Sequence, residues 1–312
     1  MTLIEAFEQG NVADFGKPDR VVDTVLSKVF FFGDRVTKVY KHEKAFYGDL
    51  TDESFRKEFY TEDFYWNHFM SPEVYRKLVH EVDDFYIEMV RIDSEKTLTK
   101  LSLTGMVTPE TMRDLTVILV QKLRMISEEH HPKLEALFRR GLLNIHLESL
   151  EDLRNFAYMA DGSIPRAKTD QIVDLLLRKS TEESYFEDPK RHRISAAIDN
   201  NPDNIIIDNA IRFIDIMPPK ENWKVADEYF TIVRNAVDGF VLSSDALGDE
   251  VYTTYFAVND PIPECVTLIY EIRSGMIQWA HRTFMGQPDI AEKYRQFTER
   301  RVLTLQEVMK GV

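Results

Sequence analysis

Patterns typical of β-strands and of α-helices occupy different parts of this chain. Runs of β-branched or aromatic residues lie at 21–26, 29–32, 35–41 and 85–90. A Gly-Asp pair separates the second and third runs, so these two predict a β-hairpin. A helix is expected over about residues 52–69, because the proline after Ser71 disfavours helical backbone there.

The rest of the chain is mostly helical in pattern. Residues 108–110 supply an N-cap threonine, a first-turn proline and an early acid, and apolar residues then recur at helical spacing. Further helices are expected to begin at Ser149, to span 169–179, and to fill most of the chain beyond Asn222. Strands followed by helices predict an α+β protein, and 312 residues suggest two folded units at about 150 residues each.

Composition narrows the classes of partner. The chain has 39 Lys and Arg against 53 Asp and Glu, and the net charge of −14 argues against a nucleic-acid partner. One cysteine cannot form an internal disulfide, and no Cys/His array supports a structural zinc site. No apolar run is long enough for a signal peptide or a membrane span. We therefore expect a cytoplasmic protein without a membrane partner; the sequence does not indicate its oligomeric state.

One segment interrupts the helical pattern. Residues 198–216 comprise a polar loop, an apolar run, an Asp-Asn turn and a second apolar run. A buried hairpin of this kind would deliver Asp199, Asn204 and Asp215 to one end. Mg²⁺ prefers carboxylate and amide oxygens together with substrate phosphates. Phosphoryl transfer needs, beside such ligands, a carboxylate that accepts the proton of the substrate hydroxyl. An ordinary turn-rich loop between two strands accounts for the same residues equally well.

The segment resembles the catalytic loop of the aminoglycoside phosphotransferase and choline kinase branch of the protein-kinase-like superfamily. That pattern is roughly H-G-D-x-H-P-D/G-N, followed by an apolar run and a metal-binding Asp. The resemblance implies that Asp199 is the catalytic aspartate and that Asn204 and Asp215 are metal ligands. Residues 197–198 replace the His-Gly pair, and Asn201 replaces the second His; these changes bear on the rate of any reaction.

The first hairpin carries the resemblance further. Residues 24–38 are similar to the T-H-x-S-x-V-F-L-x-G-D-x-V-Y-K pattern of one bacterial subgroup, which leads to a phosphate-binding lysine. Lys38 matches that lysine. Lys41 stays an alternative, because a one-residue shift in strand pairing reverses which side chain faces the nucleotide. The resemblance implies that the turn around Ser27 covers the ATP phosphates.

Two later stretches match in the same order. The helix that ends before Pro72 resembles an E-x-x-L-N-R-x-x-x-P-x-x-Y stretch, whose acid pairs with the lysine. Asp63 aligns best with that acid and Glu62 lies beside it, although an Asp reaches less far than a Glu. Glu88 and Met89 stand where the family's hinge meets adenine. Residues 223–227 resemble a segment in which a structural Asp ties down the catalytic loop.

The resemblance implies a bilobal protein-kinase-like fold, with a β-rich lobe at 1–92, a helical lobe at 93–312 and the active site between them. It implies an ATP- and Mg²⁺-dependent phosphotransferase that acts on a hydroxyl of a small molecule. Two alternatives stay open: a pseudokinase that binds nucleotide or a partner without turnover, and a kinase that acts on a protein hydroxyl. Residues 236–312 match nothing that identifies the acceptor.

Overall fold

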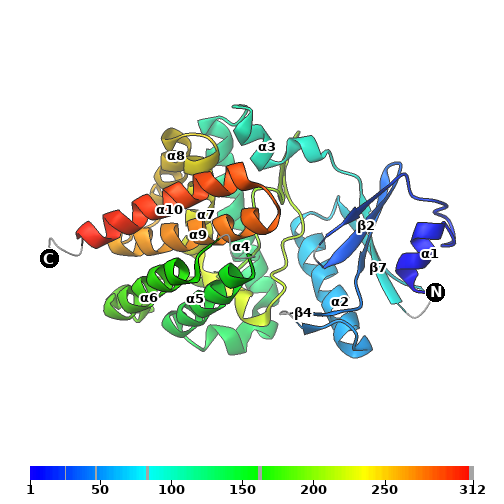
Figure 1. The fold of residues 1–312 in the computed structure, drawn as a ribbon, viewed down its shortest axis with the longest axis horizontal. Coiled ribbons are helices and arrows are strands. Elements are labelled where there is room, and N and C mark those ends of the chain that lie inside the picture. Colours follow the sequence, from blue (N-terminus) through cyan, green and yellow to red (C-terminus); the bar gives the residue numbers. More distant parts are fainter. Residues whose placement is uncertain (25, 46–47, 82–83, 161–163, 309–312) are drawn as a thin grey trace. The chain divides into compact units, whose positions relative to one another are not determined.

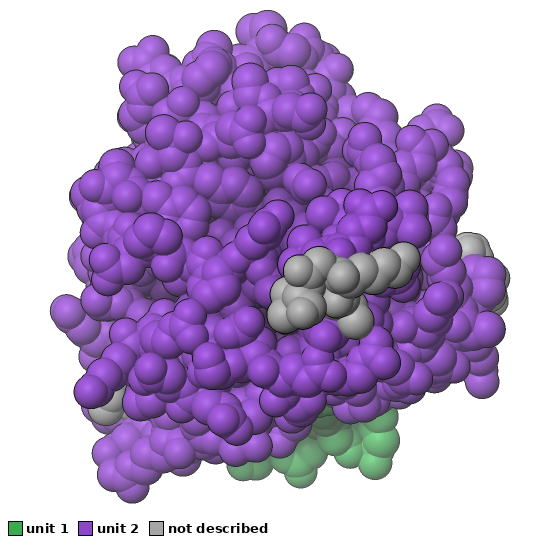
Figure 2. All heavy atoms as spheres, turned by 90° about the vertical axis from the view of Figure 1, so that its left-hand side faces the viewer, with its two compact units in different colours: residues 1–97, 203–221 green, residues 98–202, 222–312 purple. Residues whose placement is uncertain are grey.

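The computed structural model describes residues 1–312 except 25, 46–47, 82–83, 161–163 and 309–312. The chain forms two compact units, coloured separately in Figure 2. Unit 1 comprises residues 1–97 and 203–221, and unit 2 comprises residues 98–202 and 222–312. Each unit is therefore built from two stretches that are distant in the sequence. The predicted α+β class is confirmed.

Unit 1 is built on a five-stranded antiparallel sheet in the order β1-β2-β3-β7-β6 (Figure 1). The strands are β1 (Arg20–Asp23), β2 (Ser27–Phe32), β3 (Arg35–Tyr40), β6 (Tyr75–Glu81) and β7 (Asp84–Val90). The predicted hairpin is confirmed, and its turn uses Gly33 at a φ of 58°, which glycine adopts without a steric penalty. Two short pairs complete the unit: β4 (Lys44–Ala45) with β5 (Gly48–Asp49), and β9 (Ile205–Ile207) with β10 (Ile211–Phe213).

Two helices pack on this sheet, α1 (Leu3–Gln9) and α2 (Glu53–Met70). Phe7 of α1 lies in one hydrophobic cluster with Val39, whereas Tyr60 of α2 contacts the ring of Tyr40. Because successive side chains of a strand point to opposite faces, the two helices cover opposite faces of the sheet. Helix α2 confirms the predicted helix, and Asp52 caps it by accepting a hydrogen bond from the amide of Phe55 at 2.8 Å.

Unit 2 is mainly helical (Figure 1). Its α-helices are α3 (Leu98–Leu103), α4 (Pro109–Phe138), α5 (Leu142–Met159), α6 (Arg166–Glu182), α7 (Glu228–Leu242), α8 (Asp245–Phe256), α9 (Glu264–Phe284) and α10 (Pro288–Val308). Strand β8 (Ile194–Ala196) pairs with β11 (Val225–Asp227). The described residues also form single-turn 3₁₀ helices: η1 (Ser94–Lys96, in unit 1), η2 (Ser184–Phe186) and η3 (Glu221–Trp223). No helix in the described part of the chain is long and apolar enough to cross a membrane.

Two helices of unit 2 begin earlier than predicted: α6 begins at Arg166 rather than at Thr169, and α5 begins before Ser149. Thr108 caps α4 as expected, because its hydroxyl accepts a hydrogen bond from the amide of Thr111. Ser149, predicted to begin a helix, instead lies inside α5. Its hydroxyl donates to the carbonyl of Ile145 at 2.7 Å, a bond that a serine makes within a helix. The helix begins earlier, after Gly141, because apolar residues from Leu142 onward continue its buried face.

Candidate functional site

Lys38 lies buried in unit 1, between two carboxylates. The register of β2 and β3 pairs Lys38 with Val29, which directs the lysine to the sheet face that α2 covers. Its Nζ is 3.2 Å from Oδ2 of Asp63 and 2.5 Å from Oδ1 of Asp215. Burial opposes the charge, but Asp215 and Asp63 outweigh it and raise the pKa of Lys38 well above its usual range. The lysine is therefore a cation shared by two acids.

Asp63 reaches Lys38 from the middle of α2. Its carboxylate is 1% exposed and accepts a hydrogen bond from Nδ2 of Asn67 at 2.8 Å, one helical turn along. Burial raises the pKa of Asp63 more than Lys38 lowers it. Glu62 is rotated about 100° around the helix from Asp63. Of the two acids, Asp63 is the one that pairs with Lys38, and the shorter side chain reaches the lysine.

Lys41 and Ser27 bind the chain at Asp23 and Thr24, at the end of β1. Nζ of Lys41 is 2.6 Å from Oδ1 of Asp23 and 2.5 Å from the carbonyl of Thr24. The amide and the hydroxyl of Ser27 each lie 2.9 Å from the hydroxyl oxygen of Thr24, and Ser27 is buried. The register thus separates the two candidate lysines, because Lys38 joins the acids and Lys41 joins the turn.

The hairpin of β9 and β10 brings Asn204 and Asp215 together. The carbonyl of Asn204 accepts a hydrogen bond from the amide of Ile214 at 2.9 Å, and Nδ2 of Asn204 donates to the carbonyl of Asp215 at 3.2 Å. The side chain of Asp215 is 59% exposed. The hairpin places one carboxylate and one amide side chain at the same end, as the sequence predicted for these two residues.

Glu88 and Met89 lie near the end of strand β7. Met89 pairs with Val36 and therefore faces the same side of the sheet as Lys38, whereas Glu88 faces the other side. Arg35 binds the Glu88 carboxylate through Nε at 3.2 Å and through its second guanidinium nitrogen at 3.0 Å. Burial would raise the pKa of Glu88, but the bonds from Arg35 and Lys77 lower it below its usual value. Glu88 thus ties three strands of the sheet together.

Asp199 lies in unit 2, on the loop that follows β8. A guanidinium nitrogen of Arg234 donates to Oδ1 of Asp199 at 3.0 Å, and the other donates to the carbonyl of Ile198 at 3.4 Å. The Asp199 side chain is 42% exposed. Sequence reasoning missed Arg234, although a charged residue inside the apolar run of α7 was a signal for a specific partner.

The same loop is anchored by two asparagines. Asn200 is fully buried and donates through Nδ2 to the carbonyl of Thr231 at 3.0 Å and to Oδ1 of Asn235 at 2.8 Å. Nδ2 of Asn201 lies 3.0 Å from Nδ1 of His281. Asn201, which stands where the family pattern has a histidine, therefore attaches the loop to α9.

Asp227 acts on this region from β11, which pairs with β8. Its carboxylate accepts hydrogen bonds from the hydroxyls of Tyr185 at 2.6 Å and Tyr270 at 2.9 Å, and it caps α7 at the amide of Tyr229. Burial raises the pKa of Asp227 despite these bonds. Asp227 therefore holds the strand pair from which the Asp199 loop departs.

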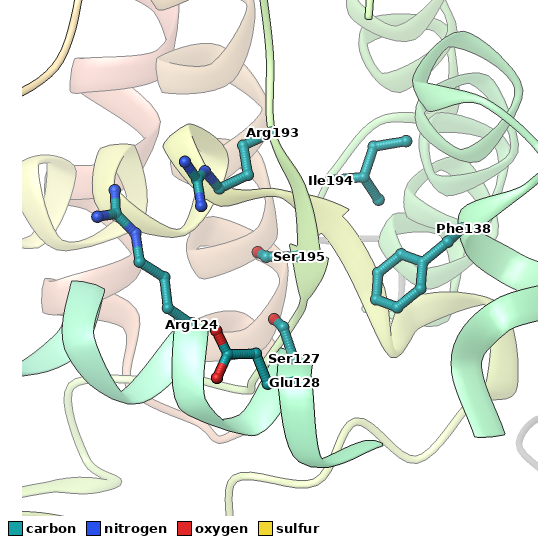
Figure 3. Close-up of a pocket in the computed structure, with 7 residues that line it drawn as sticks. All are labelled: Arg124, Ser127, Glu128, Phe138, Arg193, Ile194 and Ser195. Atoms are coloured by element: carbon teal, nitrogen blue, oxygen red, sulfur yellow. The ribbon is translucent and has the colours of Figure 1, made fainter. Parts of the chain in front are cut away.

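A recess of about 340 Å³ lies between α4 and β8 in unit 2 (Figure 3). Its Arg124 binds Glu228 through two hydrogen bonds of 2.8 and 2.9 Å, so this charge is already paired within the unit. None of the predicted site residues is among the described residues that line it. The lining comprises Arg124, Ser127, Glu128, Phe138, Arg193, Ile194 and Ser195.

Metal-binding groups are sparse. Within the described ranges, no group of three or more His, Cys, Asp or Glu side chains is arranged to hold a metal ion. Mg²⁺ sites of phosphoryl transfer need fewer protein ligands, because one or two side-chain oxygens combine with substrate phosphates and water. The carboxylate of Asp215 and the amide oxygen of Asn204 have the hard-oxygen chemistry that such a site requires.

Solved structures with the same architecture were found. APH(4)-Ia, an aminoglycoside phosphotransferase solved as a thermostable mutant with AMP-PNP and hygromycin B, matches at a TM-score of 0.54 and 14% identity, covering 97% of this chain and 98% of that one. A choline/ethanolamine kinase family protein from Mesorhizobium loti matches at a TM-score of 0.52 and 13% identity, over 99% and 95% of the two chains. The chain has the fold of aminoglycoside phosphotransferases and choline kinases.

This is the fold that the resemblance of the hairpin and of the Asp199 loop implied. The GDP complex of a mutant aminoglycoside 2'-phosphotransferase-IIIa shares it at a TM-score of 0.54 and 11% identity, over 96% and 97% of the two chains. No protein-family model matches the chain, and no curated protein matches its sequence. The fold is therefore retained at a sequence identity too low to transfer an activity.

Proposed function

We propose that this protein is an ATP- and Mg²⁺-dependent phosphotransferase that phosphorylates a hydroxyl of a small molecule. The observation that carries the proposal is the pairing of Lys38 with both Asp63 and Asp215. Phosphoryl transfer depends mainly on positioning and on electrostatic stabilisation of the phosphates. Lys38 is buried and is fixed by Asp63 of α2, and Asp215 beside it is exposed and has metal-binding chemistry. Together these residues supply the positioning and the electrostatic stabilisation.

Each residue of this cluster has a role in the proposal. Lys38 would bind the nucleotide phosphates while Asp63 holds its ammonium group in place. Asp215 and Asn204 would hold Mg²⁺, which when bound neutralises charge on the phosphates. Backbone groups at Glu88 and Met89 would meet the adenine ring.

Asp199 would act on the acceptor. Asp199 stands five positions before Asn204 in the chain. Its carboxylate is partly exposed and is oriented by Arg234. It would accept the proton of the acceptor hydroxyl as the oxygen bonds to the γ-phosphorus and the bond to the β-phosphate oxygen breaks, which releases ADP. The likeness to structures holding AMP-PNP with hygromycin B, or GDP, supports testing both adenine and guanine nucleotides.

A second candidate is a nucleotide-binding protein without turnover. The ion pair between Arg234 and Asp199 favours it, because a carboxylate engaged by a guanidinium has less capacity to accept a hydroxyl hydrogen bond. Asn201 in place of a histidine agrees with this candidate.

The test is thermal unfolding with millimolar ATP or GTP, with and without Mg²⁺, since a ligand that binds only the folded state raises stability. Transfer of the γ-phosphate is then followed with panels of aminoglycosides, amino alcohols, sugars and proteins. Transfer to a small molecule that disappears in Asp199→Asn supports the enzyme, and transfer only to protein contradicts the proposed acceptor class. Stabilisation without transfer or hydrolysis supports the second candidate. No stabilisation by either nucleotide contradicts both.

A further inference from the structure

Asp215 has an unusual backbone conformation. Its φ is 50°, in the left-handed region that residues with a Cβ rarely adopt. In the described part of the chain, Asp14 is the one other non-glycine residue with a positive φ. Such a conformation costs free energy and persists only where surrounding contacts fix it.

Three side chains of one short segment make those contacts. Ser71, which caps the end of α2, donates its hydroxyl to the carbonyl of Phe213 at 2.8 Å and accepts the amide of Phe213 at 3.2 Å. The hydroxyl oxygen of Tyr75, at the start of β6, accepts the amide of Asp215 at 2.8 Å. Oδ1 of Asn67, in the last turn of α2, accepts the amide of Ile216 at 3.0 Å.

These contacts are buried and come from residues spaced four apart. Asn67, Ser71 and Tyr75 are each at most 2% exposed. A buried backbone amide without a partner is strongly unfavourable, so the three acceptors determine where the amides of residues 213, 215 and 216 can lie. They therefore fix the path of the chain on both sides of the Asp215 carboxylate.

Asn67 extends this arrangement to Lys38. The same side chain that accepts the amide of Ile216 donates through Nδ2 to Oδ1 of Asp63 at 2.8 Å. One residue thus fixes the acid that holds Lys38 and the segment that carries Asp215. The Asp215 backbone would stay in place even when its carboxylate leaves Lys38.

The geometry points to Tyr75 as the positioning residue for Asp215, with Asn67 and Ser71 holding the flanking residues so that the carboxylate is presented to a divalent cation. This inference rests on the proposed function, because it takes Asp215 as a metal ligand. Tyr75 acts through the backbone amide of Asp215, so removing its hydroxyl weakens metal binding without removing a ligand.

The test compares Tyr75→Phe with Tyr60→Phe. The hydroxyl oxygen of Tyr60 accepts the amide of Tyr40 at 2.6 Å, and Tyr60 is fully buried in the same unit. Each variant therefore loses one buried bond between a tyrosine hydroxyl and a backbone amide, but only Tyr75→Phe affects Asp215. Tyr60→Phe thus controls for the loss of stability.

Two readouts are used. The first is the Mg²⁺ concentration that gives half of the ATP-induced stabilisation, which we expect to rise about fivefold in Tyr75→Phe, the worth of one hydrogen bond, and to stay unchanged in Tyr60→Phe. The second is hydrogen exchange at the Asp215 amide in the ligand-free protein, expected to accelerate about fivefold or more in Tyr75→Phe alone. If Tyr75→Phe does not fold, Ser71→Ala provides the Mg²⁺ readout, and hydrogen exchange is then followed at the amide of Phe213, which Ser71 accepts.

The outcomes separate the two proposals. Unchanged exchange at Asp215 in Tyr75→Phe overturns the inference. Faster exchange with an unchanged Mg²⁺ midpoint also overturns it, because Tyr75 then has only a structural role. If the wild-type protein shows no Mg²⁺-dependent stabilisation by ATP or GTP, the proposed function fails and the metal-presenting role fails with it. The exchange readout still decides whether Tyr75 fixes the Asp215 backbone.

Discussion

Lys38 and Asp215 are 177 positions apart in the chain, yet 2.5 Å separates Nζ of the lysine from Oδ1 of the aspartate. Asp63 pairs with the same ammonium group at 3.2 Å. One buried cation thus serves two carboxylates, and a phosphate or a metal ion that binds there must replace part of this pairing.

Replacing Lys38 should affect both folding and nucleotide binding. Lys38→Met leaves Asp63 buried without its cation, so we expect a loss of about 3–5 kcal/mol in unfolding free energy and no stabilisation by ATP. Lys41→Met is the matched control: its ion pair with Asp23 is partly exposed and worth at most about 1 kcal/mol. Urea denaturation and thermal shifts with ATP measure both effects. If Lys41→Met lost the ATP response and Lys38→Met kept it, Lys41 rather than Lys38 would be the lysine that binds phosphate.

Asp215→Asn tests the metal ligand directly. The side chain is largely exposed and Lys38 keeps Asp63, so we expect the fold to be retained and the Mg²⁺ dependence of ATP binding to be lost. Asp208→Asn removes another acid of the same hairpin, one that pairs with Arg212, and should leave the Mg²⁺ response intact. Mg²⁺ titrations followed by thermal unfolding distinguish the two variants. Equal responses to Mg²⁺ in both variants would contradict a metal at Asp215.

Asp199→Asn should separate catalysis from binding. Without a carboxylate to accept the hydroxyl proton, we expect transfer to slow by about 10²–10⁴-fold, while Mg²⁺-dependent ATP binding stays within a factor of about two. Arg234→Gln, which removes the charge that orients Asp199, should slow transfer by a smaller factor. Steady-state rates and ATP dissociation constants measure these effects. A faster Arg234→Gln enzyme would show that the arginine blocks the carboxylate rather than orienting it.

His146 makes stability depend on pH. Nε2 of His146 lies 2.9 Å from the hydroxyl of Ser180, which itself donates to Leu176, and Nδ1 lies 3.1 Å from a guanidinium nitrogen of Arg273. The ring therefore donates through Nε2 and accepts at Nδ1. Burial and the neighbouring Arg273 lower the pKa of His146 well below its usual value.

A histidine with a depressed pKa in the folded state takes up its proton more readily in the unfolded state. Stability should therefore fall as the pH drops below about 6.5, by up to about 1.4 kcal/mol per pH unit until the folded pKa is reached. His146→Gln should flatten this slope, whereas His130, whose pKa burial lowers to about 4, still contributes in the variant. Urea denaturation between about pH 7.5 and 5.5 measures the difference. An unchanged slope in His146→Gln would contradict the assignment.

Much of the fold followed from short-range patterns, and the exceptions have physical causes. The hairpin of β2 and β3 and the long helix α2 carry clear periodicities and turn or cap residues. Strand β6 was not predicted, because it lies at the edge of the sheet and its exposed and half-buried residues do not alternate. A register shift between Tyr75 and Lys77 interrupts its pairing with β7. Helix α1 was missed as well; it is only seven residues long.

By itself, the sequence determined which local elements form and which short stretches carry oxygen ligands, because strand alternation, helical periodicity and turn residues act over a few positions. It also placed Asn204 and Asp215 at one end of a hairpin. The family resemblance favoured Lys38 and Asp63, but only the tertiary structure shows that these two side chains pair in the interior and that Asp215 joins them. Strand register and the rotation of α2 decide which side chains face each other. The hydrogen bonds of Asn67, Ser71 and Tyr75 to residues 213–216 likewise join segments about 140 positions apart, and no local pattern encodes such a contact.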